Sequence, residues 1–124
     1  MKKLWLCLVL VLAGCASIQN PLNITRLADI ESAYGIVLAA ANAYRTVYTI
    51  NPCTRSHPES ATNYCARRSV VILLQGADRK AQIALRSARI FVANNPTLDA
   101  GSVIGVAQLA IDAMRQIEQQ NGVR

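Results

Sequence analysis

The stretch LADIESAYGIVLAAANAYRTVY, residues 27–48, carries the clearest periodicity in the chain. Its apolar positions recur at alternating steps of three and four residues: Leu27, Ile30, Tyr34, Val37, Ala41, Tyr44 and Tyr48. Such steps align side chains on one face of an α-helix over about three heptads. The pattern therefore predicts a long helix whose apolar stripe packs against other helices.

Two further stretches repeat this pattern. Residues 66–93 carry a second stripe: Val70, Leu74, Ala77, Ala81, Ala84, Ala88 and Phe91. Residues from about 98 to 120 carry a third: Val103, Ala107, Ala110, Met114 and Ile117. Neither shows the alternation of a strand, so both are predicted helices.

Polar residues beside these stretches predict where the helices begin. We expect Asn23 or Thr25 to cap the first helix and Thr97 to cap the third, because their side chains can accept hydrogen bonds from free backbone N–H groups. The tyrosines of the first stripe are expected in the core or at its rim, with hydroxyl groups that reach water.

Proline and glycine predict where the helices end. Pro52 and Pro96 should stop the first two helices, because proline donates no backbone hydrogen bond and disfavours the helical conformation of the residue before it. Gly122 should take the left-handed conformation that often follows a last helical turn. We expect an all-α fold, a three-helix bundle of long antiparallel helices.

The third predicted helix has more apolar surface than two neighbours would cover. Ile104 and Ile111, together with Val106 and Leu109, extend its stripe almost around the helix. A monomer rarely needs so wide an apolar face. The excess points to a homo-oligomer or to a partner protein.

The second predicted helix carries most of the excess positive charge in a chain with a formal net charge of +6. This candidate basic face has one acid, Asp78, among six cations: Arg67, Arg68, Arg79, Lys80, Arg86 and Arg89. Such a face can be merely solvated, or it can contact lipid headgroups, lipopolysaccharide phosphates or an acidic protein. The chain has one Trp and one Phe, too few to stack nucleic-acid bases, so nucleic acid is not an expected partner.

The residue types needed for catalysis or metal binding do not cluster in the sequence. The single histidine, His57, follows Ser56 in a polar stretch, but a serine nucleophile needs a base held across the fold and an acid behind that base. The sequence also has no glycine-rich phosphate loop. We expect no enzymatic activity, no cofactor and no metal.

The first 15 residues resemble the signal peptide of bacterial lipoproteins. Lys2 and Lys3 form a positive segment, and residues 4–12 form an apolar segment too short to span a bilayer. Leu12-Ala13-Gly14-Cys15 then matches the lipobox of that family. The resemblance implies cleavage before Cys15, a diacylglycerol on its sulfur and, commonly, acylation of its new amine.

This resemblance also implies a division of the chain and a location. The divisions would be a signal peptide (1–14), a lipidated N-terminus and linker (15–22) and a helical bundle domain (23–124). Ala16 follows the cysteine where lipoproteins retained in the inner membrane commonly carry Asp. The expected place is therefore the outer membrane, with the lipid as anchor and the domain on the periplasmic side.

The lipoprotein resemblance leaves one pair of cysteines. Cys7 would be removed with the signal peptide and Cys15 would be acylated, so Cys53 and Cys65 remain. A disulfide is expected between them in an oxidising periplasm, closing the loop between the first two helices. Zinc is the alternative, but with His57 the loop offers at most three ligands and a structural site takes four.

A second resemblance covers only NPTLDAG, residues 95–101, which is similar to small uncharacterised proteins of phages and prophages. It includes no motif with a known mechanism. The function we expect is that of a membrane-anchored envelope lipoprotein, a structural or interaction module that binds an envelope protein. The alternative is a phage-derived lipoprotein that blocks superinfection or assists lysis by binding an envelope protein.

Overall fold

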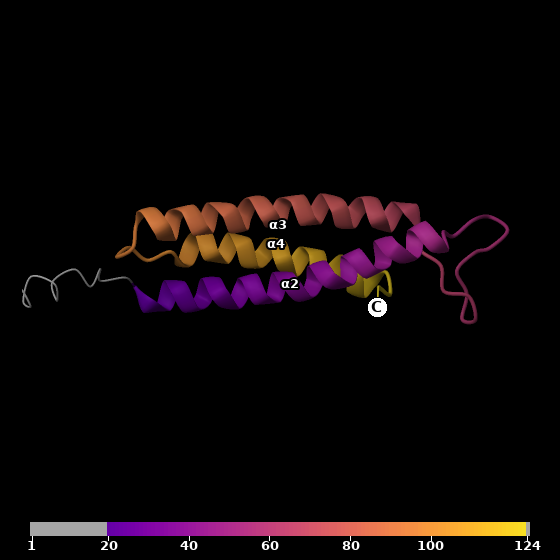
Figure 1. Cartoon of the computed structure of the whole chain (residues 1–124), viewed down its shortest axis with the longest axis horizontal. Helices are drawn as coiled ribbons and strands as arrows, with labels where there is room; N and C mark the ends of the chain where they lie inside the picture. Colours follow the sequence, from indigo (N-terminus) through magenta and orange to yellow (C-terminus); the bar gives the residue numbers. More distant parts are fainter. Residues whose placement is uncertain (1–19, 124) are drawn as a thin grey trace, which may run out of the picture.

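The computed structural model of the chain describes residues 20–123, so the predicted signal peptide and Cys15 lie outside the described residues. This part of the chain forms three helices and no strand: α2 (Pro21–Ile50), α3 (Arg68–Asn94) and α4 (Gly101–Gln120). Figure 1 shows them side by side in an elongated bundle, with consecutive helices antiparallel. The predicted all-α three-helix bundle is confirmed.

Helix α2 begins earlier than the sequence suggested. Asn20 caps it, because its Oδ1 accepts a hydrogen bond of 3.2 Å from the N–H of Leu22. Pro21 is the first helical residue, a position where the missing N–H costs nothing. The prediction that Asn23 or Thr25 caps α2 is wrong, since both lie inside the helix, and residues 21 and 22 of the expected linker are helical.

Asn23 instead joins α2 to the connection between α3 and α4. Its side chain is only 1% exposed. Its Nδ2 donates to the carbonyl of Leu98 at 2.7 Å, and its Oδ1 accepts from the N–H of Ala100 at 3.2 Å. One amide therefore pairs two backbone groups of a connection that would otherwise lack partners.

Helix α4 begins at Gly101, so the prediction that Thr97 caps it is also wrong. The cap bond comes from Asp99, whose Oδ1 accepts from the N–H of Gly101 at 3.0 Å. Thr97 lies in the preceding turn, where the N–H of Leu98 donates to the carbonyl of Asn95. At the other end, Gly122 has φ +63°, the left-handed conformation expected past the last turn.

The core confirms most of the first two stripes and shifts the third. In α2, the buried apolar residues are Ile30, Val37, Ala41 and Tyr44. In α3, five residues of the predicted stripe are buried: Val70, Leu74, Ala77, Ala81 and Ala88. Leu85 is buried as well, and Ala84 is only half-buried. In α4, Ile104 and Ile111 are buried beside Ala107 and Met114, whereas Val103, Ala110 and Ile117 are half-buried. Like α2 and α3, helix α4 packs against both other helices, and its inward face lies between its two apolar rows.

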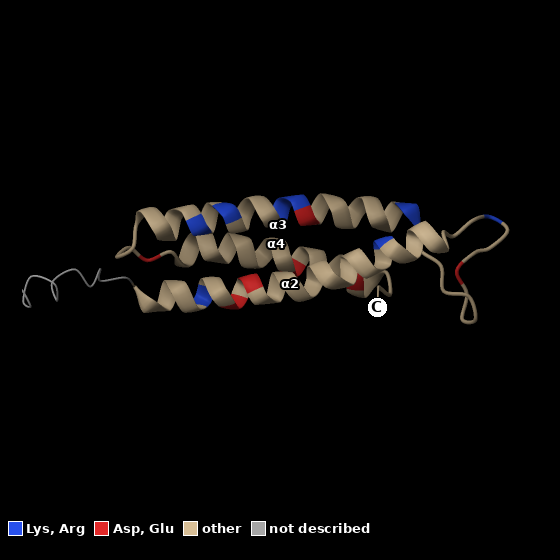
Figure 2. Cartoon of the chain, in the orientation of Figure 1, with Lys and Arg blue, Asp and Glu red and all other residues tan. Residues whose placement is uncertain are grey.

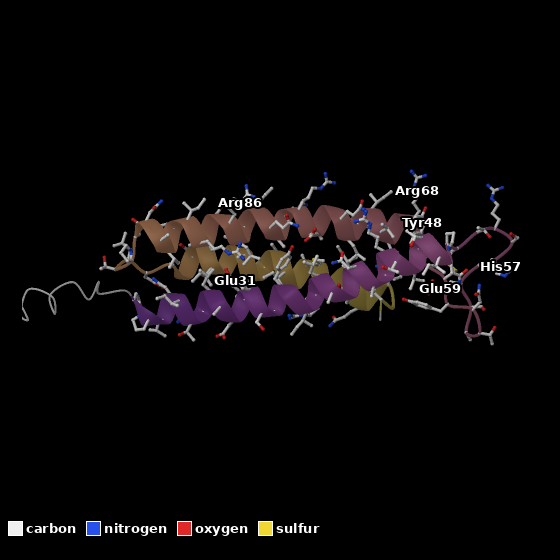
Figure 3. All side chains as sticks on the ribbon, in the orientation of Figure 1. Glu31, Tyr48, His57, Glu59, Arg68 and Arg86 are labelled. Carbon is white, nitrogen blue, oxygen red and sulfur yellow. A yellow bond between two sulfur atoms is a disulfide. The ribbon has the colours of Figure 1, made fainter. Side chains whose placement is uncertain are left out.

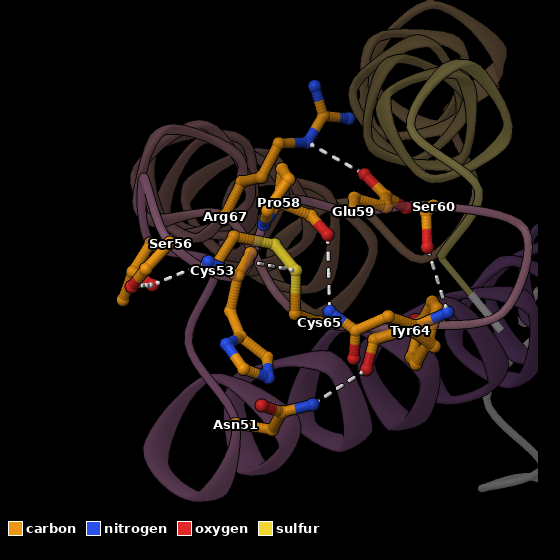
Figure 4. Close-up of a disulfide and its surroundings, with 12 residues drawn as sticks. Asn51, Cys53, Ser56, Pro58, Glu59, Ser60, Tyr64, Cys65 and Arg67 are labelled. Carbon is orange, nitrogen blue, oxygen red and sulfur yellow. Dashed lines mark hydrogen bonds and ion pairs between the residues drawn. A yellow bond between two sulfur atoms is a disulfide. The ribbon is translucent and has the colours of Figure 1, made fainter.

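The loop between α2 and α3 is closed by a disulfide between Cys53 and Cys65, as predicted (Figure 4). Backbone hydrogen bonds reinforce the closure at its base: the N–H of Cys53 donates to the carbonyl of Ala66 at 2.8 Å, and the N–H of Ala66 donates to the carbonyl of Asn51 at 3.1 Å. The loop projects from the end of the bundle opposite Asn20 (Figure 1).

Candidate interaction surface

Two of the six predicted surface cations are held within the fold. Arg67 lies just before α3, and its Nε is 3.4 Å from Glu59 while its Nη2 donates to Asn121 at 3.0 Å. Arg89 forms an ion pair with Glu31 of α2. Both residues connect parts of the bundle, so the structure does not support them as members of a free basic face.

The other four cations are exposed along α3 and make no ion pair with residues 20–123: Arg68, Arg79, Lys80 and Arg86. Figure 2 shows the basic residues spread over the length of α3, and Figure 3 shows Arg68 and Arg86 projecting away from α2.

The one acid of α3 does not neutralise these cations, because it faces α2. Asp78 Oδ1 accepts from the hydroxyl of Tyr34 at 2.6 Å, and its Oδ2 accepts from Gln82 at 2.9 Å. The hydroxyl of Tyr34 therefore contacts a carboxylate. Burial raises the pKa of Tyr34, and the hydrogen bond to Asp78 raises it further.

Exposed isoleucines interleave with the cations, a feature that the sequence reasoning missed. Ile72, Ile83 and Ile90 lie on the same outward face as Arg79 and Arg86, and Ile83 is 67% exposed. The order 72, 79, 83, 86 and 90 follows helical steps of 7, 4, 3 and 4, which the sequence does contain. A second periodic row was therefore available beside the core stripe.

Next to this row runs a groove between α3 and α4, formed by two adjoining hollows of about 390 and 290 Å³. Lys80 and Ala110 line both hollows. The first hollow also contacts Ile83, Ala84, Ser87, Val103 and Val106, and the second also contacts Ile72, Leu73, Gly76, Ala77, Ala113 and Ile117. No residue of α2 lines either one, so this α3–α4 groove lies on the side away from α2.

Helix α4 contributes the second wall of the groove and an apolar rim. Val106 is exposed, and Leu109 is 71% exposed. The apolar excess expected on the third helix is thus present at these two positions. Ile104 and Ile111, expected to add to it, are buried in the core instead.

In the polar loop, Ser56 and His57 both contact Thr54. Ser56 Oγ lies 3.1 Å from the hydroxyl of Thr54, and the backbone N–H of His57 donates to that same hydroxyl at 3.0 Å. His57 is exposed (Figure 3). Between residues 20 and 123, no three His, Cys, Asp or Glu side chains lie close enough to hold a metal ion.

One buried carboxyl group was not predicted. Glu118 is among the buried residues of α4, and its Oε1 has no hydrogen-bond partner in the described structure. Burial raises the pKa of this carboxyl group to about 7, and the charge of Arg115 lowers it by less. The predicted stripe continued from Met114 to Ile117, so Glu118 was not expected to be buried. Residue 118 does follow Ile104 and Ile111 at steps of seven, which is the signal that could have placed it on the inward face.

No protein-family model, curated protein or solved structure matches the chain. Over residues 20–123, no helix combines the length and the hydropathy needed to cross a lipid bilayer.

Proposed function

We propose that this chain is an envelope lipoprotein, anchored in the outer membrane through Cys15, that acts as a non-catalytic interaction module. The observation that carries the proposal is the exposed surface of α3 and α4. It combines apolar side chains such as Ile83 and Leu109 with three cations that make no ion pair within residues 20–123: Arg79, Lys80 and Arg86. Large exposed apolar surface in a folded domain is typical of a binding surface.

Helix α2 begins only a few residues after Cys15, so the proposed link between the lipid and the bundle is short. Asn20 lies five positions after Cys15, and an extended chain of that length reaches no more than about 18 Å. The Asn20 end of the bundle would therefore stay next to the membrane. The 30 residues of α2 extend about 45 Å from there, which would hold the loop closed by Cys53 and Cys65 well inside the periplasm.

Labelled palmitate tests the anchor. Cells expressing the full chain or Cys15→Ala would be labelled, and only the full chain should incorporate the lipid. Cys7→Ala is the matched control, because it removes a cysteine of the predicted signal peptide and should leave labelling intact. Equal labelling of the wild type and Cys15→Ala would refute the proposed anchor.

Fractionation of the same cells tests the location. The wild type should be found with the outer membrane. Replacement of Ala16 by Asp should move it to the inner membrane, because the lipoprotein resemblance implies that Asp after the acylated cysteine causes retention there. A wild-type protein found in the inner-membrane fraction would contradict the assignment.

A further inference from the structure

The α3–α4 groove has the dimensions of a helix-binding site. It runs from Ile72 to Ser87, about four turns of α3 or roughly 22 Å. Small residues such as Gly76, Ala84 and Ala110 line it, so the backbone of a guest helix could approach closely. Exposed apolar side chains, including Ile83 and Val106, stand along it and would flank such a guest.

The charges of the groove are all of one sign. Lys80 lies at the junction of the two hollows, and Arg79 and Arg86 lie on the adjacent outward face of α3. Neither hollow is lined by Asp or Glu. Asp78 is directed at α2, and Asp112 of α4 is bonded to Gln108 and Arg115.

This charge pattern selects among the possible occupants. A second copy bound through the same groove would bring two Lys80 side chains together near the twofold axis, since Lys80 sits where the hollows meet. A membrane would touch the projecting side chains but would not fill a concave floor. An amphipathic helix with acidic residues beside its apolar row satisfies both the shape and the charge.

We infer that the α3–α4 groove binds an amphipathic helix of an acidic partner protein. The apolar residues of that helix enter the two hollows, and a carboxylate near its middle pairs with Lys80. The inference specifies the partner class of the proposed interaction module. The inference rests on the proposed function for the location of the partner, the periplasm. The groove itself is formed by α3 and α4 and does not depend on that proposal.

Two synthetic helical peptides of about 16 residues test the inference. The first carries Leu at positions i, i+4, i+7 and i+11 with Glu beside them, and the second carries Lys in place of every Glu. Binding to the full chain would be measured by fluorescence anisotropy. The protein would be held in phosphatidylcholine nanodiscs through its lipid, or used free in solution if Cys15 carries none.

The acidic peptide should bind at least about tenfold more tightly than the basic one, and Lys80→Glu should abolish or reverse that preference. Arg45→Glu, the same charge change on α2, should preserve it. Ile83→Ser should weaken the binding of the acidic peptide at least about tenfold. Ile36→Ser is the matched control, because Ile36 is 71% exposed on α2, outside the groove, and this change should have no effect.

Three results would overturn the inference. The first is equal binding of both peptides, or binding that Ile83→Ser leaves intact. The second is a concentration-dependent dimer of the chain that Ile83→Ser dissociates, which would identify a second copy as the occupant. The third is binding to phosphatidylcholine vesicles containing phosphatidylglycerol, lost in Ile83→Ser, without peptide binding. Val106→Ser, a change at an exposed residue that lines the first hollow, repeats each test if Ile83→Ser does not fold. Palmitate labelling at Cys15 remains an independent test of the anchor.

Discussion

The hydroxyl of Tyr44 in α2 accepts a hydrogen bond of 2.9 Å from the backbone N–H of Arg67, immediately before α3. Tyr44 is 1% exposed, so its hydroxyl does not reach water as expected for the tyrosines of the first stripe. Its ring also lies edge-on to Tyr64, with centroids 6.4 Å apart. One side chain thus joins α2, the loop and the start of α3.

Replacing Tyr44 with Phe should lower the free energy of unfolding by about 1–2 kcal/mol, because the N–H of Arg67 then loses its partner. Urea denaturation of the purified full chain measures this. Tyr48→Phe is the control, since Tyr48 lies one turn further along α2 and its hydroxyl makes no hydrogen bond with residues 20–123. Equal losses in both variants would contradict a specific role for the Tyr44 bond.

Asn23→Asp should destabilise the chain by more than about 2 kcal/mol at neutral pH. The new side chain cannot donate to the carbonyl of Leu98, and it buries a charge without a cation beside it. Asn42→Asp makes the same change at an exposed position of α2 and should shift the urea midpoint little. If both variants unfold at the wild-type midpoint, the two bonds of Asn23 do not stabilise the fold.

Reduction of the disulfide between Cys53 and Cys65 should lower the free energy of unfolding by about 2–4 kcal/mol, since the bridge restricts the unfolded chain. The helix content measured by far-ultraviolet circular dichroism should remain unchanged, because the core residues of α2 and α3 lie outside the loop. The double variant Cys53→Ala with Cys65→Ala is the control and should not respond to reductant. In the soluble domain, which lacks Cys7 and Cys15, two free thiols after unfolding without reductant would disprove the bridge.

The buried carboxyl group of Glu118 should make stability depend on pH. Its pKa is about 7 in the folded chain and 4.5 in the unfolded reference. The folded state therefore holds the proton more tightly, and this contribution is fully present below about pH 4.5 and lost as the pH rises through about 7. Each unit of difference in pKa corresponds to about 1.4 kcal/mol.

Glu118→Gln removes this charge, so its gain over the wild type should grow between about pH 4.5 and 7 and stay constant above that. Melting curves across this range measure the difference. Asp29→Asn, which removes an exposed carboxylate of α2, should give no such trend. Parallel pH profiles for the wild type and Glu118→Gln would show that residue 118 titrates normally.

The sequence was sufficient to predict three helices and their approximate extents, because helical spacing is a local property. The disulfide could be predicted because the lipoprotein resemblance left a single pair of cysteines. It was not sufficient to place the starts of α2 and α4. Asn23 resembles a cap in sequence, but its partners, Leu98 and Ala100, lie more than 70 positions away. Only the packing of the three helices determines that Asn20 caps α2 and that Asn23 instead bonds to the connection between α3 and α4.

The basic face shows the same limit. Its six cations are evident in the sequence, but Arg89 pairs with Glu31, 58 positions away. The exposed row of Ile72, Ile83 and Ile90 has helical spacing too, and spacing alone does not distinguish an inward row from an outward one. The groove beside that row depends on how α3 and α4 meet, which neither helix specifies by itself.

Between residues 20 and 123 the chain runs along the bundle axis three times, once in each helix, which is an odd number. The chain therefore enters at the Asn20 end and leaves α4 toward the opposite end, near the loop (Figure 1). The 20 residues of α4 carry it about 30 Å along the axis. A reporter domain fused after Val123 is thereby displaced from the Asn20 end of the bundle without any added spacer. A bundle with an even number of helices would instead return the same fusion to the end where the chain began.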